Sequence, residues 1–511
     1  MGNWIIYLSS CVSLCFLLIL IKFLNKLWWT PIQIQSLMRS QGIKGPPYRF
    51  LHGSTKEIIN MVKGVMISPM ELSHHVFPRI QPHIYSWMRL YGKNFLYWNG
   101  PQAHLVVTEP ELVKEILNNK DGAYPKPETE GYWKKLLGNG LVSSSGEKWV
   151  KHRKLANYAF HAESLKGMIP AMISSVGMML ERWRKQKVKE IELFHEFKVL
   201  TSEIISRTAF GSSCLEGENI FDMLTKMALI VSRNTYKIRI PGIRKLVKID
   251  DDIESDKLEQ GIRNSITQMI RKREVTVTGE SDSSNDFLGL LMKAYHDTDK
   301  TKSISVDDLI DECKTFYFAG HETTTSSLTW TLFLLAMHTE WQDKARMEVL
   351  DLIGQQNPTL DSISKLKTIN MIVHESLRLY PPVCHVPRTV NREVRLGNVT
   401  LPEDVKLIIS NLALHHDPEI WGEDAHLFKP ERFAVGVSKA TKTNAATCYL
   451  PFGLGPRNCV GSNFANTEIK IVLSMILQRY KFILSPTYIH SPTVRITLYP
   501  QHGVKIMMKE I

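Results

Sequence analysis

The stretch best suited to chemistry is a short glycine-rich run near the C-terminus, PFGLGPRNCVG at residues 451–461. It places Cys459 among small residues and close to Arg457, just before an apolar stretch with a helical pattern. A nearby cation and a helix N-terminus both favour a thiolate, and glycine lets a flat cofactor approach the backbone. The run therefore predicts a thiolate presented to a metal. The alternative is a buried structural thiol, the commoner fate of a lone cysteine.

A second pattern, AGHETTT at 319–325, lies inside a long helical stretch from 305 to 341. A glycine in mid-helix costs about 1 kcal/mol relative to alanine, so something should compensate for Gly320. Tight helix packing is one explanation. The other is a gap beside the helix in which Glu322 and Thr323 deliver protons to a bound ligand.

Two further pairs of residues have the spacing of helix neighbours. Trp149 and Arg153 are four apart and could jointly hold one anionic group, although alone they would be read as an ordinary basic helical turn. Glu375 and Arg378 are three apart in HESLRLYPP and can pair. Such a pair is usually exposed and contributes only a few tenths of a kcal/mol.

Together these motifs resemble those of the cytochrome P-450 monooxygenases. The spacing Phe-x-x-Gly-x-Arg-x-Cys-x-Gly resembles their haem-binding loop, and AGHETT resembles their oxygen-activating segment. The family buries its Glu-x-x-Arg pair and joins it to the arginine of a Pro-Glu-Arg-Phe motif, which implies a structural triad of Glu375, Arg378 and Arg432. The resemblance spans nearly the whole chain from Gly42. It is closest to plant members of the branch with secologanin synthase, cytokinin trans-hydroxylase and the brassinosteroid-inactivating hydroxylases, through runs such as GPPYRFLHGSTKEI and HHDPEIWGEDAHLFKPERF.

The resemblance implies a role for each matching residue. Cys459 would be the axial ligand of haem b (iron protoporphyrin IX), and Thr323 with Glu322 would organise water and proton delivery to dioxygen. The residues expected to hold the haem or its carboxylates are Trp149, Arg153, Arg388, Phe452, Gly455, Arg457 and Gly461.

The implied reaction inserts one oxygen atom into a hydrophobic small molecule of terpenoid, hormone-like or fatty-acid type, in plant secondary or hormone metabolism. No flavin or dinucleotide fingerprint accompanies the motifs, so electrons would come from an NADPH-dependent cytochrome P-450 reductase. Candidate docking residues are Lys148, Lys151, Lys154 and Lys429, although a solvated charged face is the simpler reading of each alone.

Two other functions compete with this interpretation. A haem-thiolate isomerase or dehydratase would rearrange a hydroperoxide without reductase or dioxygen, and a non-catalytic haem-binding protein would only carry or sense. Members of the first kind typically depart from the threonine pattern, whereas Thr323 and Thr324 are intact here. A carrier would have little use for Glu322 beside Thr323.

The composition of the chain limits the kinds of partner and surface that it can bind. The chain has 511 residues, 43% of them hydrophobic, and a net charge of +12. This charge suits an anionic membrane surface or an acidic partner, and no zinc-finger or RNA-binding signature points to nucleic acid. The seven cysteines are scattered and form no C-x-x-C pair, which argues against a disulfide framework or an iron–sulfur set.

The N-terminus predicts a membrane anchor. The run from Trp4 to Ile21 is uncharged and reaches the lower limit for a bilayer-spanning helix, and lysines follow it. The charge distribution places the remainder in the cytosol, and the resemblance implies a single-pass protein of the endoplasmic reticulum. A cleaved signal peptide is the alternative, but a basic start and a cleavage site are missing. We expect an anchor at 1–27, a proline-rich hinge at 28–50 and a haem-binding domain at 51–511.

The expected body is mainly α-helical with a small β-rich part. Strands at 95–98 and 104–108 flank the Asn99-Gly100 turn signal, in a loop longer than two residues. Thr108 and Ser305 are predicted to cap the helices that follow them. Residues 122–148 have no clear period and predict a long functional loop. The polar stretch 278–286 predicts a surface loop.

Overall fold

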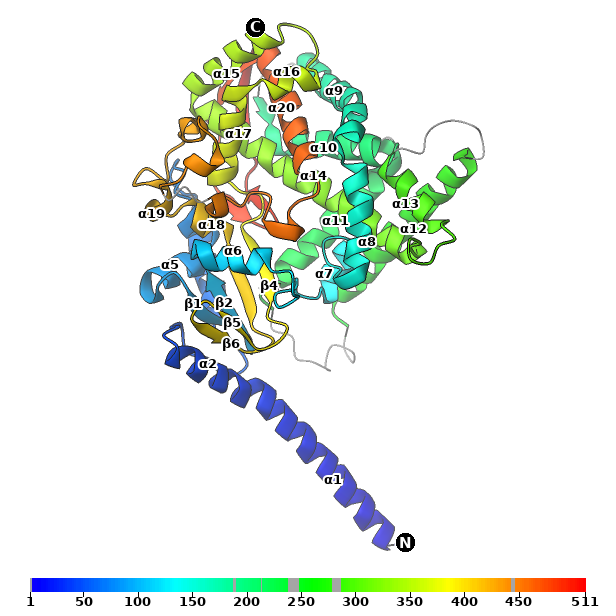
Figure 1. The fold of residues 1–511 in the computed structure, drawn as a ribbon, viewed down its shortest axis with the longest axis vertical. Helices are drawn as coiled ribbons and strands as arrows, with labels where there is room; N and C mark the ends of the chain where they lie inside the picture. Colours follow the sequence, from blue (N-terminus) through cyan, green and yellow to red (C-terminus); the bar gives the residue numbers. More distant parts are fainter. Residues whose placement is uncertain (1, 187–189, 213, 238–247, 278–285, 443–445) are drawn as a thin grey trace.

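Helices make up most of the computed structural model, which describes residues 2–186, 190–212, 214–237, 248–277, 286–442 and 446–511 (Figure 1). The helices are α1 (Gly2–Leu24), α2 (Thr30–Ser40), α3 (Thr55–Met66), α4 (Phe77–Ile80), α5 (Pro82–Tyr91), α6 (Pro110–Asn118), α7 (Gly131–Leu137), α8 (Gly146–Ala159), α9 (Ala162–Lys185), α10 (Leu193–Ala209), α11 (Cys214–Asn234), α12 (Asp250–Val277), α13 (Phe287–Tyr295), α14 (Val306–Met337), α15 (Thr339–Leu352), α16 (Leu360–Ser364), α17 (Lys367–Leu379), α18 (Asn411–His415), α19 (Pro418–Trp421) and α20 (Ser462–Arg479). Shorter turns of helix are η1 (Asn25–Trp29), η3 (Pro430–Phe433), η4 (Val437–Lys439), η5 (Ala446–Cys448) and η6 (Gly455–Arg457).

The strands form small sheets, as the composition of the body predicted. The strands are β1 (Phe95–Asn99), β2 (Gln102–Val107), β3 (Glu190–Glu192), β4 (His385–Thr389), β5 (Val394–Leu396), β6 (Val399–Leu401), β7 (Lys406–Ser410), β8 (Tyr480–Leu484), β9 (Pro492–Val494), β10 (Leu498–Pro500) and β11 (Lys505–Glu510). The largest sheet has the order β1-β2-β7-β4, in which only β2 and β7 run parallel. The others are β10-β9, β3-β11-β8 and β5-β6.

The hairpin of β1 and β2 is tighter than predicted. Asn99 pairs with Gln102, so Gly100 and Pro101 alone form the loop, and the prediction of a longer loop was wrong. Gly100 has φ of 57°, a left-handed conformation that glycine adopts without strain. Pro101 occupies the second position of this two-residue turn.

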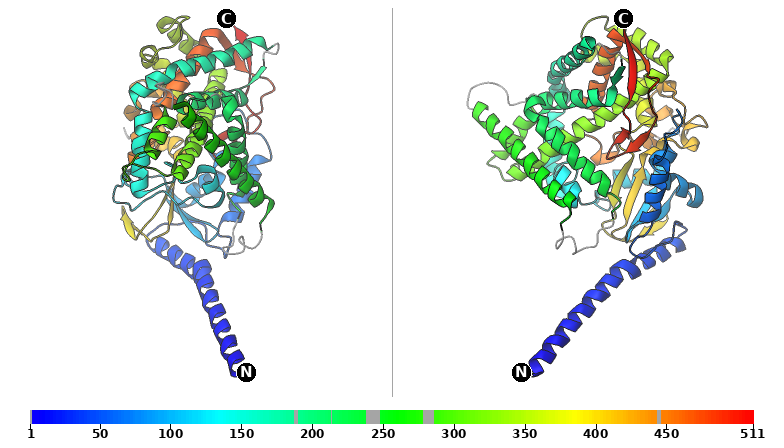
Figure 2. Two further views of the ribbon diagram at one scale, coloured as in Figure 1. Left: turned by 90° about the vertical axis from the view of Figure 1, so that its right-hand side faces the viewer. Right: turned by 180° about the vertical axis from the view of Figure 1, so that it is seen from behind.

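Helix α14 runs through the middle of the body, and most of its residues are buried (Figures 1 and 2). Ser305 caps it as predicted, because its hydroxyl accepts from the Asp308 N–H and the Asp308 carboxylate accepts from the Ser305 N–H. The predicted helix continued to Trp341, but α14 ends at Met337. His338 leaves the helical conformation, and α15 begins after it.

Two other local predictions need correction. Thr108 does not cap α6, because its hydroxyl donates to the Lys93 carbonyl (2.7 Å) and Glu109 occupies the cap position. The predicted loop at 122–148 contains helix α7. Residues 278–285, most of the predicted polar loop, lie outside the described residues.

Helix α1 projects from the body at the end where β1, β2, β5 and β6 lie (Figures 1 and 2). Within the described residues it belongs to the one helical stretch that is long and apolar enough to cross a membrane. Half of the expected hinge is helical, since α2 covers 30–40. The remainder is attached to its neighbours: the Leu96 N–H donates to the Lys44 carbonyl (2.9 Å), and the Tyr48 hydroxyl donates to the Leu27 carbonyl.

Candidate active site

The loop before α20 folds around Cys459. The Cys459 N–H donates to the Phe452 carbonyl (2.8 Å), which closes the loop. Gly455 has φ of +73°, and a Cβ there would lie 2.2 Å from the Leu117 carbonyl oxygen at the end of α6. Only glycine fits this position. A Cβ on Gly461 would lie 4.0 Å from the sulfur, so the thiol has a small neighbour on that side.

The Cys459 thiol lies in a recess. Its surface is accessible, yet the surrounding protein raises the pKa of the thiol by burial. The Gly461 N–H and the charges of Arg153 and Lys126 act in the opposite direction. The sequence predicted that Arg457 would favour the thiolate, but these other cations do so. Because burial prevails, the thiolate needs a further positive partner, and a metal ion supplies one.

Cationic side chains border the same recess. Arg388, on β4, is 4% exposed, and among the described residues its guanidinium donates only to the adjacent Pro387 carbonyl (2.8 Å). Arg457 donates to the Ser144 carbonyl (2.8 Å) and lies over the indole of Trp149, 4.1 Å from its centroid. Burial lowers the pKa of each guanidinium to about 10, which for Arg457 is reinforced by the neighbouring arginines. Both remain cationic at neutral pH.

Arg153 and Trp149, both on α8, lie close to the cysteine loop. Arg153 donates to the carbonyl (2.6 Å) and the side-chain oxygen (2.7 Å) of Asn458, the residue before the cysteine. The indole of Trp149 contacts Arg457 rather than Arg153. Helix α8 thus contributes Arg153, a cation beside the thiol, and Trp149, whose ring stacks against the guanidinium of Arg457.

Lys126 is a fourth cation that the motifs did not predict. Backbone hydrogen bonds of 2.9 and 3.0 Å tie residues 123–125 to 389–391, which holds Lys126 near the end of β4. Burial and the charges of Arg388 and Arg457 lower its pKa to about 7. The only sequence signal was a lysine between two prolines in a stretch without periodicity.

The predicted triad lies buried behind the loop. Arg378 donates from Nε and Nη2 to both carboxylate oxygens of Glu375 (2.7 and 2.8 Å), and both side chains are fully buried. Arg432 Nε lies 3.5 Å from the same carboxylate. Arg378 also donates to the carbonyls of His415 and Ala425 (2.7 Å each). The pair is therefore not a surface ion pair, and it fixes geometry between segments more than it adds stability.

The segment around Gly320 supports in part both explanations for the glycine, namely close helix packing and a space beside the helix for proton delivery. A Cβ on Gly320 would lie 2.8 Å from Ile205 Cδ1 of α10, so close helix packing explains the glycine. Thr323 donates back to the Ala319 carbonyl (2.8 Å), which leaves its oxygen able to accept. Glu322 and Thr323 keep partial exposure in the middle of a buried helix, so they border internal space.

Burial raises the pKa of the Glu322 carboxyl. Two effects lower this pKa: a hydrogen bond from the Thr497 hydroxyl (3.0 Å) and the charges of Lys198 and Arg495. No hydrogen bond joins Glu322 to Thr323, both of which the structure describes. A carboxyl whose pKa is raised by burial holds its proton more readily than an exposed one, which suits a proton donor.

Aromatic packing connects the cysteine loop to α14. The ring of Phe160, which follows α8, stacks on Phe316 of α14 at 5.3 Å and meets Phe464 of α20 edge-on at 5.6 Å. Phe464 follows Cys459 closely, and Phe316 lies one helical turn before Gly320. Aromatic contacts therefore link the helix that follows the thiol loop to the helix that carries Glu322.

The comparison with known protein families agrees with this arrangement. The family profile described as "Cytochrome P450" matches residues 73–504, most of the chain. The chain belongs to the cytochrome P450 family. It is a cytochrome P450 monooxygenase with the mainly helical fold of that family, as the motifs predicted.

Full-length plant relatives support the same assignment. "Cytochrome P450 CYP749A22" of Panax ginseng is 57% identical over 507 residues, 98% of this chain and 96% of the relative. "Cytochrome P450 734A1" of Arabidopsis thaliana is 40% identical over 521 residues, covering 100% and 98%. "11-oxo-beta-amyrin 30-oxidase" of Glycyrrhiza uralensis is 40% identical over 500 residues, covering 95% and 94%. The predicted resemblance to plant members is confirmed.

The residues of this cytochrome P450 fit the haem-thiolate cofactor that its family implies. Arg153, Arg388, Arg457 and Lys126 form no ion pair with any carboxylate among the described residues. Arg388 is buried and the other three are partly buried, and clustered cations in such surroundings without a counter-ion favour an anionic ligand. A thiol in the same recess is a suitable ligand for iron, and the two carboxylates of a haem would neutralise the cations.

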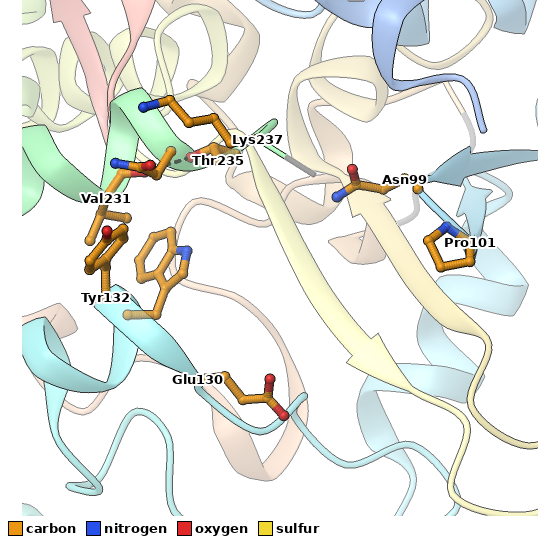
Figure 3. A pocket seen from close by; sticks show the side chains of 10 residues that line it. Asn99, Pro101, Glu130, Tyr132, Val231, Thr235 and Lys237 are labelled. Carbon is orange, nitrogen blue, oxygen red and sulfur yellow. Dashed lines mark hydrogen bonds between the residues drawn. The ribbon is translucent and has the colours of Figure 1, made fainter. Parts of the chain in front are cut away.

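A separate cavity of about 270 Å³ lies away from Cys459 (Figure 3). The β1–β2 turn, α7 and the end of α11 border it. Tyr132 donates to Asp252 (2.8 Å) and Thr235 to the Val231 carbonyl (3.1 Å), so polar groups at its wall already have partners. None of the predicted haem-binding or catalytic residues lines this cavity, although Glu130, Tyr132 and Trp133 of the predicted functional loop at 122–148 do.

Most of the predicted docking lysines are engaged within the chain. Lys154 alone among the four is exposed without a hydrogen bond or ion pair to a described residue. The others contact Asp308 (from Lys148), the Ser303 carbonyl (from Lys151, 2.8 Å) and Asp424 (from Lys429, 2.7 Å). Docking at these three positions would have to compete with internal partners.

Proposed function

We propose that this cytochrome P450 binds haem b with Cys459 as the axial ligand of the iron. Phe452, Gly455 and Gly461 shape the loop that presents the sulfur. The observation that carries this proposal is a group of cations beside an accessible thiol: Arg388 is buried, Arg153, Arg457 and Lys126 are partly buried, and none of the four pairs with a carboxylate among the described residues.

In this proposal the haem carboxylates bind Arg153, Arg388, Arg457 and the indole N–H of Trp149, with Lys126 as an added cation. Charge-assisted hydrogen bonds of this kind are roughly twice as strong as neutral ones. They would hold and orient the haem beside the cysteine loop. The bound haem supplies activation of dioxygen, and the protein supplies orientation and electrostatics.

We further propose that Glu322 and Thr323 deliver protons on the side of α14. One oxygen atom enters the substrate and the other leaves as water, which consumes two protons and two electrons. Burial raises the pKa of the Glu322 carboxyl, which favours its protonated form relative to an exposed carboxyl. Thr323 Oγ accepts from water because its own proton is donated to Ala319.

We infer a hydrophobic small-molecule substrate, of terpenoid, hormone-like or fatty-acid type. One relative is named for oxidising 11-oxo-beta-amyrin, which makes a triterpenoid the first class to test. The electrons would come from an NADPH-dependent cytochrome P450 reductase, with Lys154 as the best available docking cation.

The proposed setting is the endoplasmic reticulum membrane, with a single span and the catalytic domain in the cytosol. The proposed division is an anchor at 1–27, a linker at 28–50 and the haem-binding domain at 51–511. Support comes from the exposed apolar helix α1 and from the lysines that follow it.

Turnover in labelled dioxygen tests the proposed reaction. Purified protein is reconstituted with a plant NADPH-dependent reductase, NADPH and a panel of triterpenoids that includes 11-oxo-beta-amyrin. The expected product carries one labelled oxygen atom and depends on both NADPH and reductase. Rearrangement of a fatty-acid hydroperoxide without NADPH would instead support an isomerase or dehydratase.

A further inference from the structure

The C-terminal hairpin of β9 and β10 is fixed against the middle of α14. The Leu498 carbonyl accepts from the Ser326 hydroxyl (2.6 Å) and from the indole of Trp330 (3.4 Å). The Leu498 N–H donates to the Pro382 carbonyl (2.9 Å), in the segment that leads to β4. Three contacts at one residue leave its neighbour, Thr497, little freedom to move.

Thr497 is buried and makes one specific contact with the proton-delivery segment. Its hydroxyl donates to Glu322 Oε1 at 3.0 Å, and its side chain is shielded from solvent. Glu322 Oε2 has no hydrogen bond to a described residue, and its nearest charged-group neighbour is His321 Nδ1 at 4.0 Å. One carboxylate oxygen is therefore held and the other remains able to exchange a proton.

The other groups around Glu322 do not hold it in this way. Burial and the charge of Lys198 lower the pKa of His321 to about 3, so this ring is neutral. Lys198 and Arg495 act on Glu322 through their charge, and no hydrogen bond joins either of them to it among the described residues. The guanidinium of Arg495 lies over the ring of Tyr499, 3.7 Å from its centroid.

We propose that Thr497 is a positioning residue for Glu322. Its hydroxyl fixes Oε1 so that Oε2 is the oxygen that gives up and regains a proton. Thr497 keeps its own proton, and water replaces the proton that Glu322 loses. The inference rests on the proposed role of Glu322 in proton delivery. It adds that the C-terminal hairpin, about 175 residues away in the chain, completes that machinery.

The test measures how dioxygen is divided between hydrogen peroxide and water when no substrate is present. Formation of peroxide uses one NADPH per dioxygen with two protons, whereas formation of two waters uses two NADPH and needs further proton delivery. Reductase-coupled holoenzymes at equal haem content are compared by NADPH, dioxygen and peroxide assays. The variants are Thr497→Val, Thr497→Ala, Thr497→Ser, Glu322→Gln and the double variant Thr497→Val with Glu322→Gln.

We expect the share of water to fall about two- to tenfold in Thr497→Val, the range that corresponds to loss of one hydrogen bond. Thr497→Ser should behave like the parent protein, because it retains the hydroxyl. Thr497→Ala also lacks the hydroxyl donor, and it takes the place of Thr497→Val in the comparison if the valine variant loses haem. The double variant should match Glu322→Gln, since both changes act through one carboxyl.

Other results separate the failure of this inference from failure of the proposed function. A parental water share in Thr497→Val, together with a lowered share in Glu322→Gln, would overturn the positioning role alone. An additive fall in the double variant would do the same, because Thr497 would then act elsewhere. A parental share in Glu322→Gln would overturn the role of Glu322 and this inference together, with ligation by Cys459 unaffected.

Discussion

Buried and partly buried cations dominate the chemistry around Cys459. Burying a charge is costly unless it is paired, and the cost is visible in the pKa of Lys126, lowered to about 7, and of Arg388, lowered to about 10. A ligand with two carboxylates removes this cost. The same residues that make the recess unfavourable when empty of anions therefore contribute to retention of the proposed haem.

Removal of the Lys126 charge is expected to weaken haem retention. A charge-assisted hydrogen bond contributes about 1.5–3 kcal/mol, so Lys126→Met should accelerate haem transfer to an apo-globin acceptor by roughly ten- to a hundredfold. Lys126→Arg is the matched control and should retain haem like the parent. Equal transfer rates for Lys126→Met and the parent would exclude Lys126 from the haem site.

The pH dependence of haem retention follows from the same lysine. Without a bound anion the pKa of Lys126 is about 7, and a bound carboxylate raises it. Haem binding is then accompanied by proton uptake, so a rise in pH above about 7 should disfavour the bound state. We expect haem transfer from the parent protein to speed up over this range, and transfer from Lys126→Met to depend less on pH. The reverse slope would contradict the placement of Lys126.

The helices and loops place these side chains through a few close contacts. His152 of α8 hydrogen bonds to Glu312 of α14 in the core, and Phe160 packs between α14 and α20. Gly455 allows the cysteine loop to lie against the end of α6. The site thus depends on the close approach of these backbone segments as much as on the side chains that would bind the haem.

Alanine at position 455 is expected to displace the cysteine loop. The new Cβ would meet a backbone oxygen at 2.2 Å, and φ is +73°. Gly436→Ala is the matched control, because it has a similar φ of +95° but nothing within 4 Å. The positive φ should cost each variant about 1 kcal/mol of unfolding free energy, and Gly455→Ala should lose more because of the backbone clash; denaturant titration measures both. Only Gly455→Ala should also bind less haem, and equal haem content in both would contradict this account.

Motifs within one stretch of chain could be predicted from sequence, whereas contacts between distant stretches could not. The loop around Cys459, the Ser305 cap and the pairing of Glu375 with Arg378 follow from local spacing, although burial of that pair followed only from resemblance. Lys126 and Thr497 carry no such spacing, because their partners lie on other elements. The Thr108 cap failed because a carbonyl of a neighbouring segment competed for its hydroxyl.

The chain as a whole combines a helical body with an exposed apolar helix at its N-terminus. The exposed aromatic residues Trp28 and Trp29 follow α1, where indole suits a membrane interface. Membrane association would place the β1–β2 end of the body nearest the bilayer, because α1 leaves the body there (Figure 2). A hydrophobic substrate dissolved in the bilayer is then close to the body.

Deletion of residues 2–24 is expected to convert a firmly bound protein into a weakly bound one. The deletion spares Leu27, whose carbonyl accepts from Tyr48. The parent should remain with membranes after an alkaline wash, and the shortened protein should be released. Its absorption spectrum should be unchanged, because α1 contributes nothing to the site. Retention of the shortened protein after the wash would show that the body binds the membrane by itself.

Ligation of iron by Cys459 is the central claim, and the spectrum of the reduced carbon monoxide complex tests it most directly. A thiolate ligand gives this complex a strongly red-shifted Soret band. The parent protein and Cys384→Ser, a change at a buried cysteine elsewhere in the body, should show the band, whereas Cys459→Ser should lose it. Retention of the red-shifted band in Cys459→Ser would contradict the account.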